Sequence, residues 1–335
     1  MSIKKMGLMG FQFYVLDPFI IAMHHRDIFP QGNGKMGPKV MPVGKNSGTD
    51  FDEKAAWRMY HGNTISGFPV HPHRGFETVT VMIEGFADHF DSKGSKGRYG
   101  QGDVQWMTAG AGVQHSEMFP MLNDDEENPM ELFQIWLNLP AANKFAAPDY
   151  KMFWSENIPT VKKDGVEIKI IAGEYEGLKS LDPLPASWAY NRNNHVGIWL
   201  ITMTPQSEFT IPPVSQTLNR MLYNYIGGGI EIEDEHIRED HYAELDGSRP
   251  IKIKNRDKTT KLLLLEGEPI GEPVAARGPF VMNTEGELKQ AFLDYQKTEF
   301  GGWQWDRYDP VNEKEADRFA YYKNGEHIEY PPQSK

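Results

Sequence analysis

The chain has 335 residues, of which 39% are apolar and 24% charged, a globular composition that is long enough for two domains. A formal net charge of -12, without a long Lys/Arg cluster, makes nucleic acid and anionic membrane poor partners for the bare surface. The chain has no cysteine, so any metal must be held by histidine and carboxylate. No apolar run approaches the ~18 residues of a membrane helix, so we expect a cytoplasmic protein.

The first half of the chain changes character near residue 70. An apolar segment from Phe11 to Met23 precedes a Gly-, Pro- and Lys-rich stretch from Pro30 to Asp50, which is typical of a surface loop. From His71 to Leu139, short runs of Val, Thr, Phe, Ile and Trp alternate with turn clusters. This spacing predicts the short strands of a barrel or sandwich. Residues 140–160 hold three prolines and are predicted to link two domains.

The second half repeats the pattern of strands and turns and then changes to a helical one. Strand-like runs continue from Val166 to Val281. Apolar residues at 288, 291, 292 and 295 predict a helix over Glu285 to Thr298. We therefore expect an all-β protein with one short C-terminal helix. The predicted domains are 1–145, 146–300 and a C-terminal extension, 301–335.

Two short motifs carry the candidate chemistry. His71 and His73 are two positions apart, so in a strand both imidazoles point to the same face. His115 and Glu117 repeat this spacing in a second predicted strand. If the two strands are neighbours across a barrel, the four side chains form a metal site.

Three neutral imidazoles and one carboxylate suit Fe(II), Ni(II), Cu(II), Mn(II), Co(II) or Zn(II), whereas Mg and Ca prefer oxygen ligands. An octahedral ion held by four protein ligands keeps two positions for water, O2 or substrate. We favour Fe(II), because this set leaves open positions on a redox-active ion. A lone His-x-His is more often a surface or hydrogen-bonded pair, so the prediction depends on His115 and Glu117 completing the set.

Glu77 leaves an alternative open. Its parity matches that of His71 and His73, so it is either a ligand in place of Glu117 or a hydrogen-bond partner that fixes a histidine tautomer. We favour the second role.

The remaining histidines have weaker patterns. His24 and His25 lie beside the Gly-rich loop, where a solvated pair is the preferred interpretation and a cover over the site the alternative. His61 precedes a turn, and His236 and His241 lie in an acidic stretch without i, i+2 spacing. The second strand-rich block has no His-x-His motif, and we expect it to be free of metal.

Several segments together resemble the pirin family of the cupin superfamily. His-Pro-His-Arg-Gly-Phe-Glu-Thr-Val at 71–79 is similar to its first signature, and Gly102-Asp-Val-Gln-Trp-Met-Thr-Ala-Gly110 followed by His115-Ser-Glu117 to its second. Glu266-Gly-Glu-Pro and Gly278-Pro-Phe-Val-Met-Asn-Thr284 resemble its C-terminal barrel. The resemblance runs from about Asp17 to Phe300.

This resemblance implies two stacked cupin barrels (double-stranded β-helix, jelly-roll) with one divalent metal in the first. The family's ligands fall on His71, His73, His115 and Glu117. Two functions follow from it. Some bacterial pirins resemble quercetinases, which open a flavonol ring with O2, and Glu117 would then take the substrate's proton. Eukaryotic pirins resemble metal- or redox-responsive regulators that bind a protein partner. The segments 30–66 and 301–335 depart from the family pattern.

Overall fold

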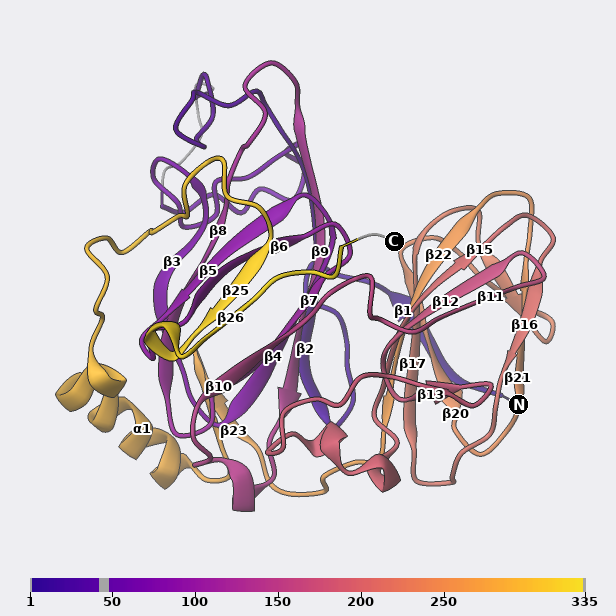
Figure 1. Cartoon of the computed structure of the whole chain (residues 1–335). Coiled ribbons are helices and arrows are strands. Elements are labelled where there is room, and N and C mark those ends of the chain that lie inside the picture. The colour runs from indigo at the N-terminus through magenta and orange to yellow at the C-terminus, as the bar shows by residue number, and fades with distance from the viewer. Residues whose placement is uncertain (1, 42–47, 334–335) are drawn as a thin grey trace. The chain divides into compact units, whose positions relative to one another are not determined.

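The computed structural model describes residues 2–41 and 48–333, which fold into two compact units (Figure 1). The larger unit consists of residues 23–156 and 272–335, and the smaller unit of residues 1–22 and 157–271. This division differs from the predicted boundaries at 145 and 300, because both ends of the chain pair with distant strands. The first strand, β1 (Ile3–Leu8), joins β20 (His241–Asp246) of the smaller unit.

The larger unit is built from antiparallel strands in two main sheets with an apolar core between them. The strands are β2 (Phe19–Phe29), β3 (Ser66–His73), β4 (Phe76–Glu84), β5 (Phe86–Asp91), β6 (Lys96–Gly100), β7 (Val104–Thr108), β8 (Val113–Phe119), β9 (Asn128–Asn138), β10 (Asp149–Phe153), β23 (Ala275–Arg277), β24 (Phe280–Met282), β25 (Phe319–Tyr322) and β26 (His327–Glu329). One sheet has the order β10-β7-β4-β9-β2 and the other β26-β25-β6-β5-β8-β3. The core takes Met107 and Leu132 from the first sheet and Tyr99 and Phe119 from the second.

The smaller unit repeats this arrangement with an aliphatic interior. Its further strands are β11 (Thr160–Lys163), β12 (Val166–Ala172), β13 (Glu174–Tyr175), β14 (Leu178–Lys179), β15 (Gly197–Met203), β16 (Glu208–Ile211), β17 (Asn219–Ile226), β18 (Ile230–Ile232), β19 (Glu235–Ile237), β21 (Ile251–Asn255) and β22 (Thr260–Gly267). The two main sheets have the orders β1-β20-β17-β22-β15-β12-β11 and β16-β21-β18-β19. Strand β21 shows why they form: buried isoleucines alternate with exposed lysines, so one face joins the core.

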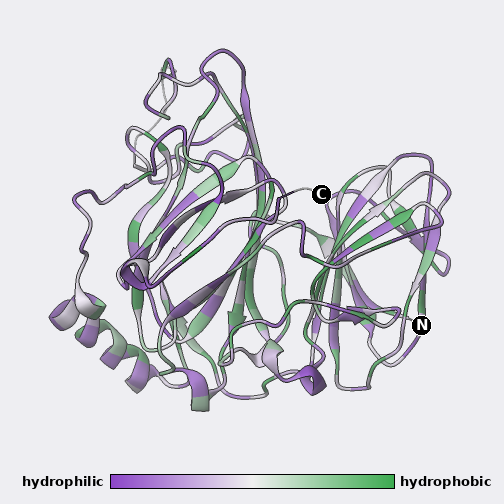
Figure 2. Ribbon diagram, viewed as in Figure 1, coloured by the Kyte–Doolittle hydropathy of each residue, from purple (hydrophilic) through white to green (hydrophobic). Residues whose placement is uncertain are grey.

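The helix predicted from apolar spacing is confirmed as α1 (Glu285–Thr298), and Figure 2 shows it as mostly hydrophilic. Thr284 caps its first turn by accepting a hydrogen bond from the Glu287 backbone, and the Glu287 side chain bonds back to the Thr284 backbone. Leu288 and Ala291 pack into an apolar cluster with Phe280 of β24.

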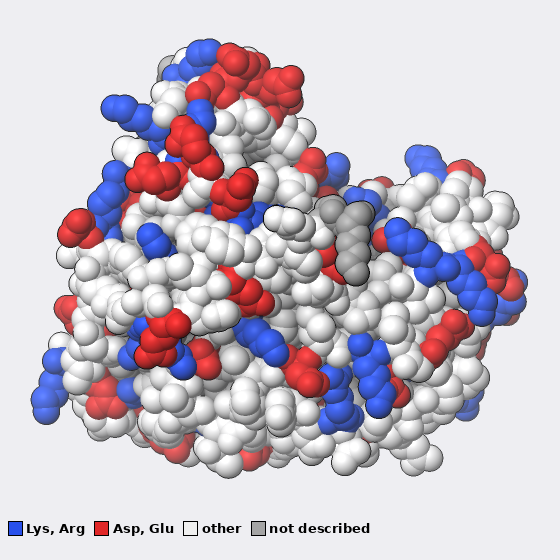
Figure 3. All heavy atoms as spheres, in the orientation of Figure 1, with Lys and Arg blue, Asp and Glu red and all other residues white. Residues whose placement is uncertain are grey.

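The surface has mixed charge. Acidic and basic side chains are interspersed on the face shown in Figure 3. No helix within residues 2–41 and 48–333 is long and apolar enough to cross a bilayer.

The last two strands of the described residues, β25 and β26, form one edge of the six-stranded sheet. Strand β25 pairs with β6, and β26 pairs with β25. Arg98 of β6 is fully buried, and its guanidinium donates hydrogen bonds to both carboxylate oxygens of Asp88. The same guanidinium donates to the carbonyls of Glu313, Lys314 and Ala316. This buried cation therefore fixes the segment that leads into β25.

Replacing Arg98 with methionine should cost about 3–5 kcal/mol of unfolding free energy, because the buried Asp88 carboxylate loses its partner. Urea unfolding of the two proteins measures the difference. The matched control is Arg307→Met, which breaks a solvent-exposed pair with Asp309 and should cost less than about 1 kcal/mol. Equal costs for the two substitutions would contradict the role of Arg98.

Candidate metal centre

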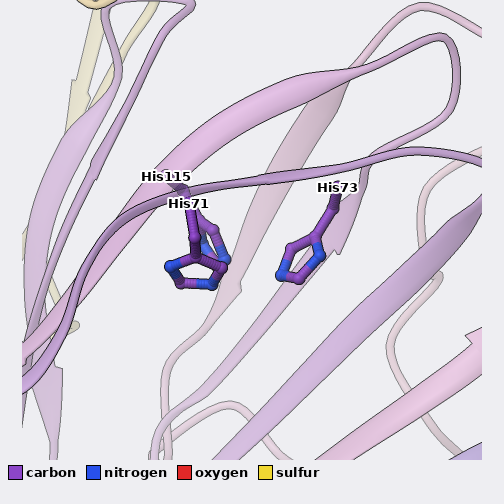
Figure 4. Close-up of side chains that lie close together, drawn as sticks. All are labelled: His71, His73 and His115. Carbon is purple, nitrogen blue, oxygen red and sulfur yellow. The ribbon is translucent and has the colours of Figure 1, made fainter. Parts of the chain in front are cut away.

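Three histidines meet inside the larger unit. Strands β3 and β8 are antiparallel neighbours, and His71 lies directly opposite His115 in their register. Each of the three rings contributes one nitrogen to a group whose members all lie within 4.8 Å of one another; the rings belong to His71, His73 and His115. Figure 4 shows the three rings side by side, two of them from β3 and one from β8. The i, i+2 spacing of His71 and His73 places both imidazoles on the inner face.

Backbone carbonyls orient two of these rings. Nδ1 of His71 lies 2.9 Å from the Pro69 carbonyl oxygen, and Nδ1 of His73 lies 3.4 Å from that of Pro279. A carbonyl oxygen only accepts hydrogen bonds, so each Nδ1 carries the proton. The lone pair is therefore on Nε2, and the rings are held in the tautomer that can bind a metal.

The third ring, that of His115, has unsatisfied polar atoms. It is fully buried, and neither of its nitrogens has a hydrogen-bond partner among the residues that the structure describes. A buried polar atom without a partner costs about 1–3 kcal/mol. A metal ion held between the rings would give one of the two nitrogens a partner and so lower this cost, and the residues present therefore fit a metal.

The protonation states are also those of a metal site. Burial lowers the pKa of His71 to about 4 and holds the pKa values of His73 and His115 well below their usual range. At neutral pH all three rings are neutral, the form that binds metal.

Glu117 lies beside the histidines on the same strand as His115. Its Oε2 is 3.9 Å from His115 Nε2 and accepts a hydrogen bond from Gln134 Nε2 at 3.1 Å. Its Oε1 is 3.0 Å from the Thr80 hydroxyl. Burial raises the pKa of this carboxyl group above its ordinary value, and the surrounding hydrogen bonds oppose the shift. Thr80 and Gln134 belong to the five-stranded sheet, so that sheet holds the carboxylate in place.

Glu77 lies elsewhere. The chain turns at Gly75, where φ is +86°, and Glu77 is the second residue of the next strand, β4, in the five-stranded sheet. There its carboxylate accepts a hydrogen bond of 2.6 Å from Thr108. The parity shared with His71 therefore does not extend across the turn, and Glu77 is not a member of the histidine group.

Two further histidines, His89 and His25, are buried in the larger unit, where the sequence did not predict them. His89 of β5 is fully buried, and its ring centroid is 5.6 Å from that of His115. It lies opposite Glu117 in the register of β5 and β8, a relation that only the strand pairing reveals. The preferred interpretation of His24 and His25 as a solvated pair is wrong for His25, which is 2% exposed, because β2 directs it inward.

A cavity of about 700 Å³ is lined by His71 and His73 of the histidine group and by Glu117. Its apolar wall includes Phe68, Phe119, Leu132 and Trp136, and its polar wall includes Thr80 and Gln134. This volume is within the usual range of small-molecule sites, about 300–1,000 Å³. The centre is therefore accessible to a ligand with a large apolar surface.

Comparison with known proteins shows which family the sequence belongs to. The Pirin family model matches residues 43–137, and the Pirin C-terminal cupin domain model matches residues 198–301. Pirin-1 of Arabidopsis thaliana is 39% identical over 248 residues, which cover 70% of this chain and 79% of that protein. The chain belongs to the pirin family. Pirin of Homo sapiens is 34% identical to this pirin over 264 residues, covering 77% and 86% of the two chains.

A solved structure shows the same fold over nearly the whole chain. Quercetin 2,3-dioxygenase from Acinetobacter baumannii superposes on this pirin with a TM-score of 0.70 and 25% identity, covering 90% of this chain and 98% of the other. The expected all-β fold with two cupin domains and a short C-terminal helix is therefore confirmed.

Proposed function

We propose that this pirin binds one divalent metal ion through His71, His73, His115 and Glu117, and that it opens a flavonol ring with O2 in the manner of a quercetinase. The observation that carries the proposal is the buried His115 ring, whose nitrogens lack partners among the described residues beside a 700 Å³ cavity. The likeness to a quercetin 2,3-dioxygenase supports the substrate class. Fe(II) is the ion we favour, because the ligand set leaves positions open on it.

The residues of the cavity have different proposed roles in the reaction. When bound, the metal supplies Lewis acidity and a site for O2. Glu117 is the proposed base that takes the proton of the substrate hydroxyl, and burial makes it a stronger base by raising its pKa. Gln134 and Thr80 keep its carboxylate aimed, and the apolar wall of the cavity keeps water away from the ionised flavonol.

The test is turnover by protein loaded with metal under anaerobic conditions and then given O2 and quercetin. Bleaching of the flavonol absorption with release of one CO per O2 consumed is the expected result. The assay is repeated with Fe, Ni, Cu, Mn, Co and Zn. If a metal binds but neither bleaching nor CO appears with any of them, the dioxygenase proposal is overturned in favour of a metal- or redox-responsive regulator that binds a protein partner.

Replacing Glu117 with glutamine should lower kcat by about 10²–10⁴-fold, the usual contribution of a general base. Stopped-flow bleaching of quercetin measures the effect, and metal analysis of the same samples shows whether the ion is retained. The control is Glu131→Gln, because Glu131 is also buried but pairs with His24 and is not part of the cavity wall. If Glu117→Gln keeps full kcat with metal bound, Glu117 is not the base.

A further inference from the structure

The outer face of the six-stranded sheet carries a row of side chains across β5, β6 and β25 (Figure 1). Tyr99 of β6 and Ala320 of β25 belong to the core. Because successive residues of a strand point to opposite faces, Lys96 and Tyr321 point outward. Lys96 lies directly opposite Tyr321 in one strand pair and directly opposite Phe90 in the other. The three side chains are therefore neighbours on the same face of the sheet.

The C-terminal extension packs against this row. The Trp305 ring meets the Phe90 ring edge-on, with the centroids 5.0 Å apart. The indole nitrogen of Trp305 donates a hydrogen bond of 2.8 Å to the Asp91 carbonyl oxygen. Gln304 Nε2 donates a hydrogen bond of 3.2 Å to the side-chain oxygen of Asn324. These contacts orient one indole ring and two side-chain amides beside the row.

A cavity of about 350 Å³ lies where the extension meets the sheet. It is lined by one ammonium group, two aromatic rings and two side-chain amides, which belong to Lys96, Trp305, Tyr321, Gln304 and Asn324. Its volume is within the usual range of small-molecule sites, about 300–1,000 Å³. The lining therefore offers a positive charge, aromatic surface and hydrogen-bonding groups in one place.

The Lys96 ammonium has aromatic neighbours but no opposite charge. It lies 6.0 Å from the Trp305 ring centroid and 5.7 Å from that of Tyr321. No carboxylate within residues 2–41 and 48–333 forms an ion pair with it. Arg98, two positions along β6 on the same face, differs, because both of its bonds to the Asp88 carboxylate are made. A ligand carboxylate at Lys96 would thus gain a charge-assisted hydrogen bond without displacing an acidic side chain.

The two amides can bind a hydroxyl group. Only the bond from Gln304 Nε2 to the Asn324 oxygen involves these two side chains among the described residues. The Gln304 oxygen is therefore still an acceptor, and the Asn324 NH2 group is still a donor. A hydroxyl group both donates and accepts, so it can bond to both amides at once.

We propose that this cavity binds a small hydroxylated aromatic carboxylate. The carboxylate bonds to Lys96, the ring packs against Trp305 and Tyr321, and the hydroxyl meets the two amides. A single ammonium matches a single carboxylate charge, and the two rings favour an aromatic acid over an inorganic anion or a sugar acid.

The proposed site is separate from the metal centre. His115 lies opposite Asp91 in the register of β8 and β5, and Asp91 directly follows Phe90. His115 and Phe90 therefore point to opposite faces of the sheet. Ligand binding at Lys96 goes beyond the proposed function and does not depend on it.

The test is isothermal titration calorimetry of the full-length protein, purified without chelators, with 4-hydroxybenzoate as the probe. The wild type should bind it with a Kd of about 1 mM or tighter. Lys96→Met removes the charge but keeps an apolar stem, and it should weaken binding about tenfold or more. Trp305→Leu should weaken it about 2–10-fold. The uncharged probe 4-hydroxybenzyl alcohol should bind the wild type about tenfold or more weakly than the acid.

The matched control is Lys5→Met in the smaller unit. Lys5 Nζ also lies over an aromatic ring, 4.0 Å from the Tyr14 centroid, and this substitution should leave the Kd unchanged. If Trp305→Leu does not fold, Lys96→Met decides alone, because its urea unfolding midpoint can be compared with that of the wild type.

Three results would overturn the proposal. They are no binding to the wild type, an unchanged Kd in folded Lys96→Met, and glucuronate, a non-aromatic acid, binding as tightly as 4-hydroxybenzoate. Binding of the probe at the metal centre would persist in Lys96→Met and so counts as the second result. No step of the titration requires turnover, so the outcome is independent of whether quercetin is cleaved.

Discussion

Replacement of His115 by alanine is expected to reduce bound metal from about one ion per chain to a small fraction. Removing a hydrogen-bond partner of a ligand typically costs 10–100-fold in metal affinity, so loss of the ligand itself should cost more than about 100-fold. The His115 ring centroid lies 4.4 Å from that of His71 and 4.9 Å from that of His73, so the substitution removes one of three closely grouped nitrogen ligands.

The measurement is elemental analysis of protein purified without chelators or nickel resin, followed by chelator competition to obtain the affinity. His61→Ala is the control, because His61 lines the same cavity but is not in the histidine group. Full occupancy in His115→Ala would remove the basis of the proposed function, since the metal would then be held elsewhere.

The metal-free protein is expected to lose several kcal/mol of unfolding free energy as the pH falls from about 6.5 to about 4. In the unfolded chain histidines bind protons below pH 6.5, whereas burial lowers the pKa of His71 to about 4 and that of His25 to about 3 in the folded protein. His73 and His115 are shifted in the same direction. The unfolded state thus binds more protons in this window. The stability that comes from keeping these histidines neutral is therefore fully present above pH 6.5 and is lost as the pH falls.

Each such histidine adds a slope of up to about 1.4 kcal/mol per pH unit. Glu117 acts in the opposite direction, because its raised pKa makes the folded state take up a proton earlier than the unfolded state. Urea unfolding at pH 7, 6 and 5 measures the total slope. His25→Phe should lower the slope by one histidine's share. An unfolding free energy that does not change between pH 7 and pH 5 would show that these rings are not held neutral.

Local patterns were enough to predict the elements, because their periodicity is short. The alternation of Val, Thr and Ile predicted strands, and the spacing of apolar residues predicted α1 over the residues where it lies. A single pairing of strands, β3 with β8, brings the two i, i+2 motifs together and places His71 opposite His115. The role of Glu117 as fourth ligand and base stays a prediction.

What the sequence did not predict depends on contacts between distant segments. His25 lies inside the cavity because Tyr60, 35 positions later, orients it, and no spacing rule connects these two residues. His89 is aligned with Glu117 only through the pairing of β5 with β8. The domain boundaries differ for the same reason, since β1 finds its partner at the far end of the smaller unit.

The order of the two units along the chain has a consequence for biosynthesis. The strands that carry the three histidines leave the ribosome early, but β25 and β26, which complete their sheet, follow only after all of residues 157–271. Until then the Arg98 guanidinium has no carbonyls from residues 313–316 to bind, and the edge of β6 stays open. The nascent protein therefore finishes the smaller unit first, and the unit that begins to form earlier is the last to mature.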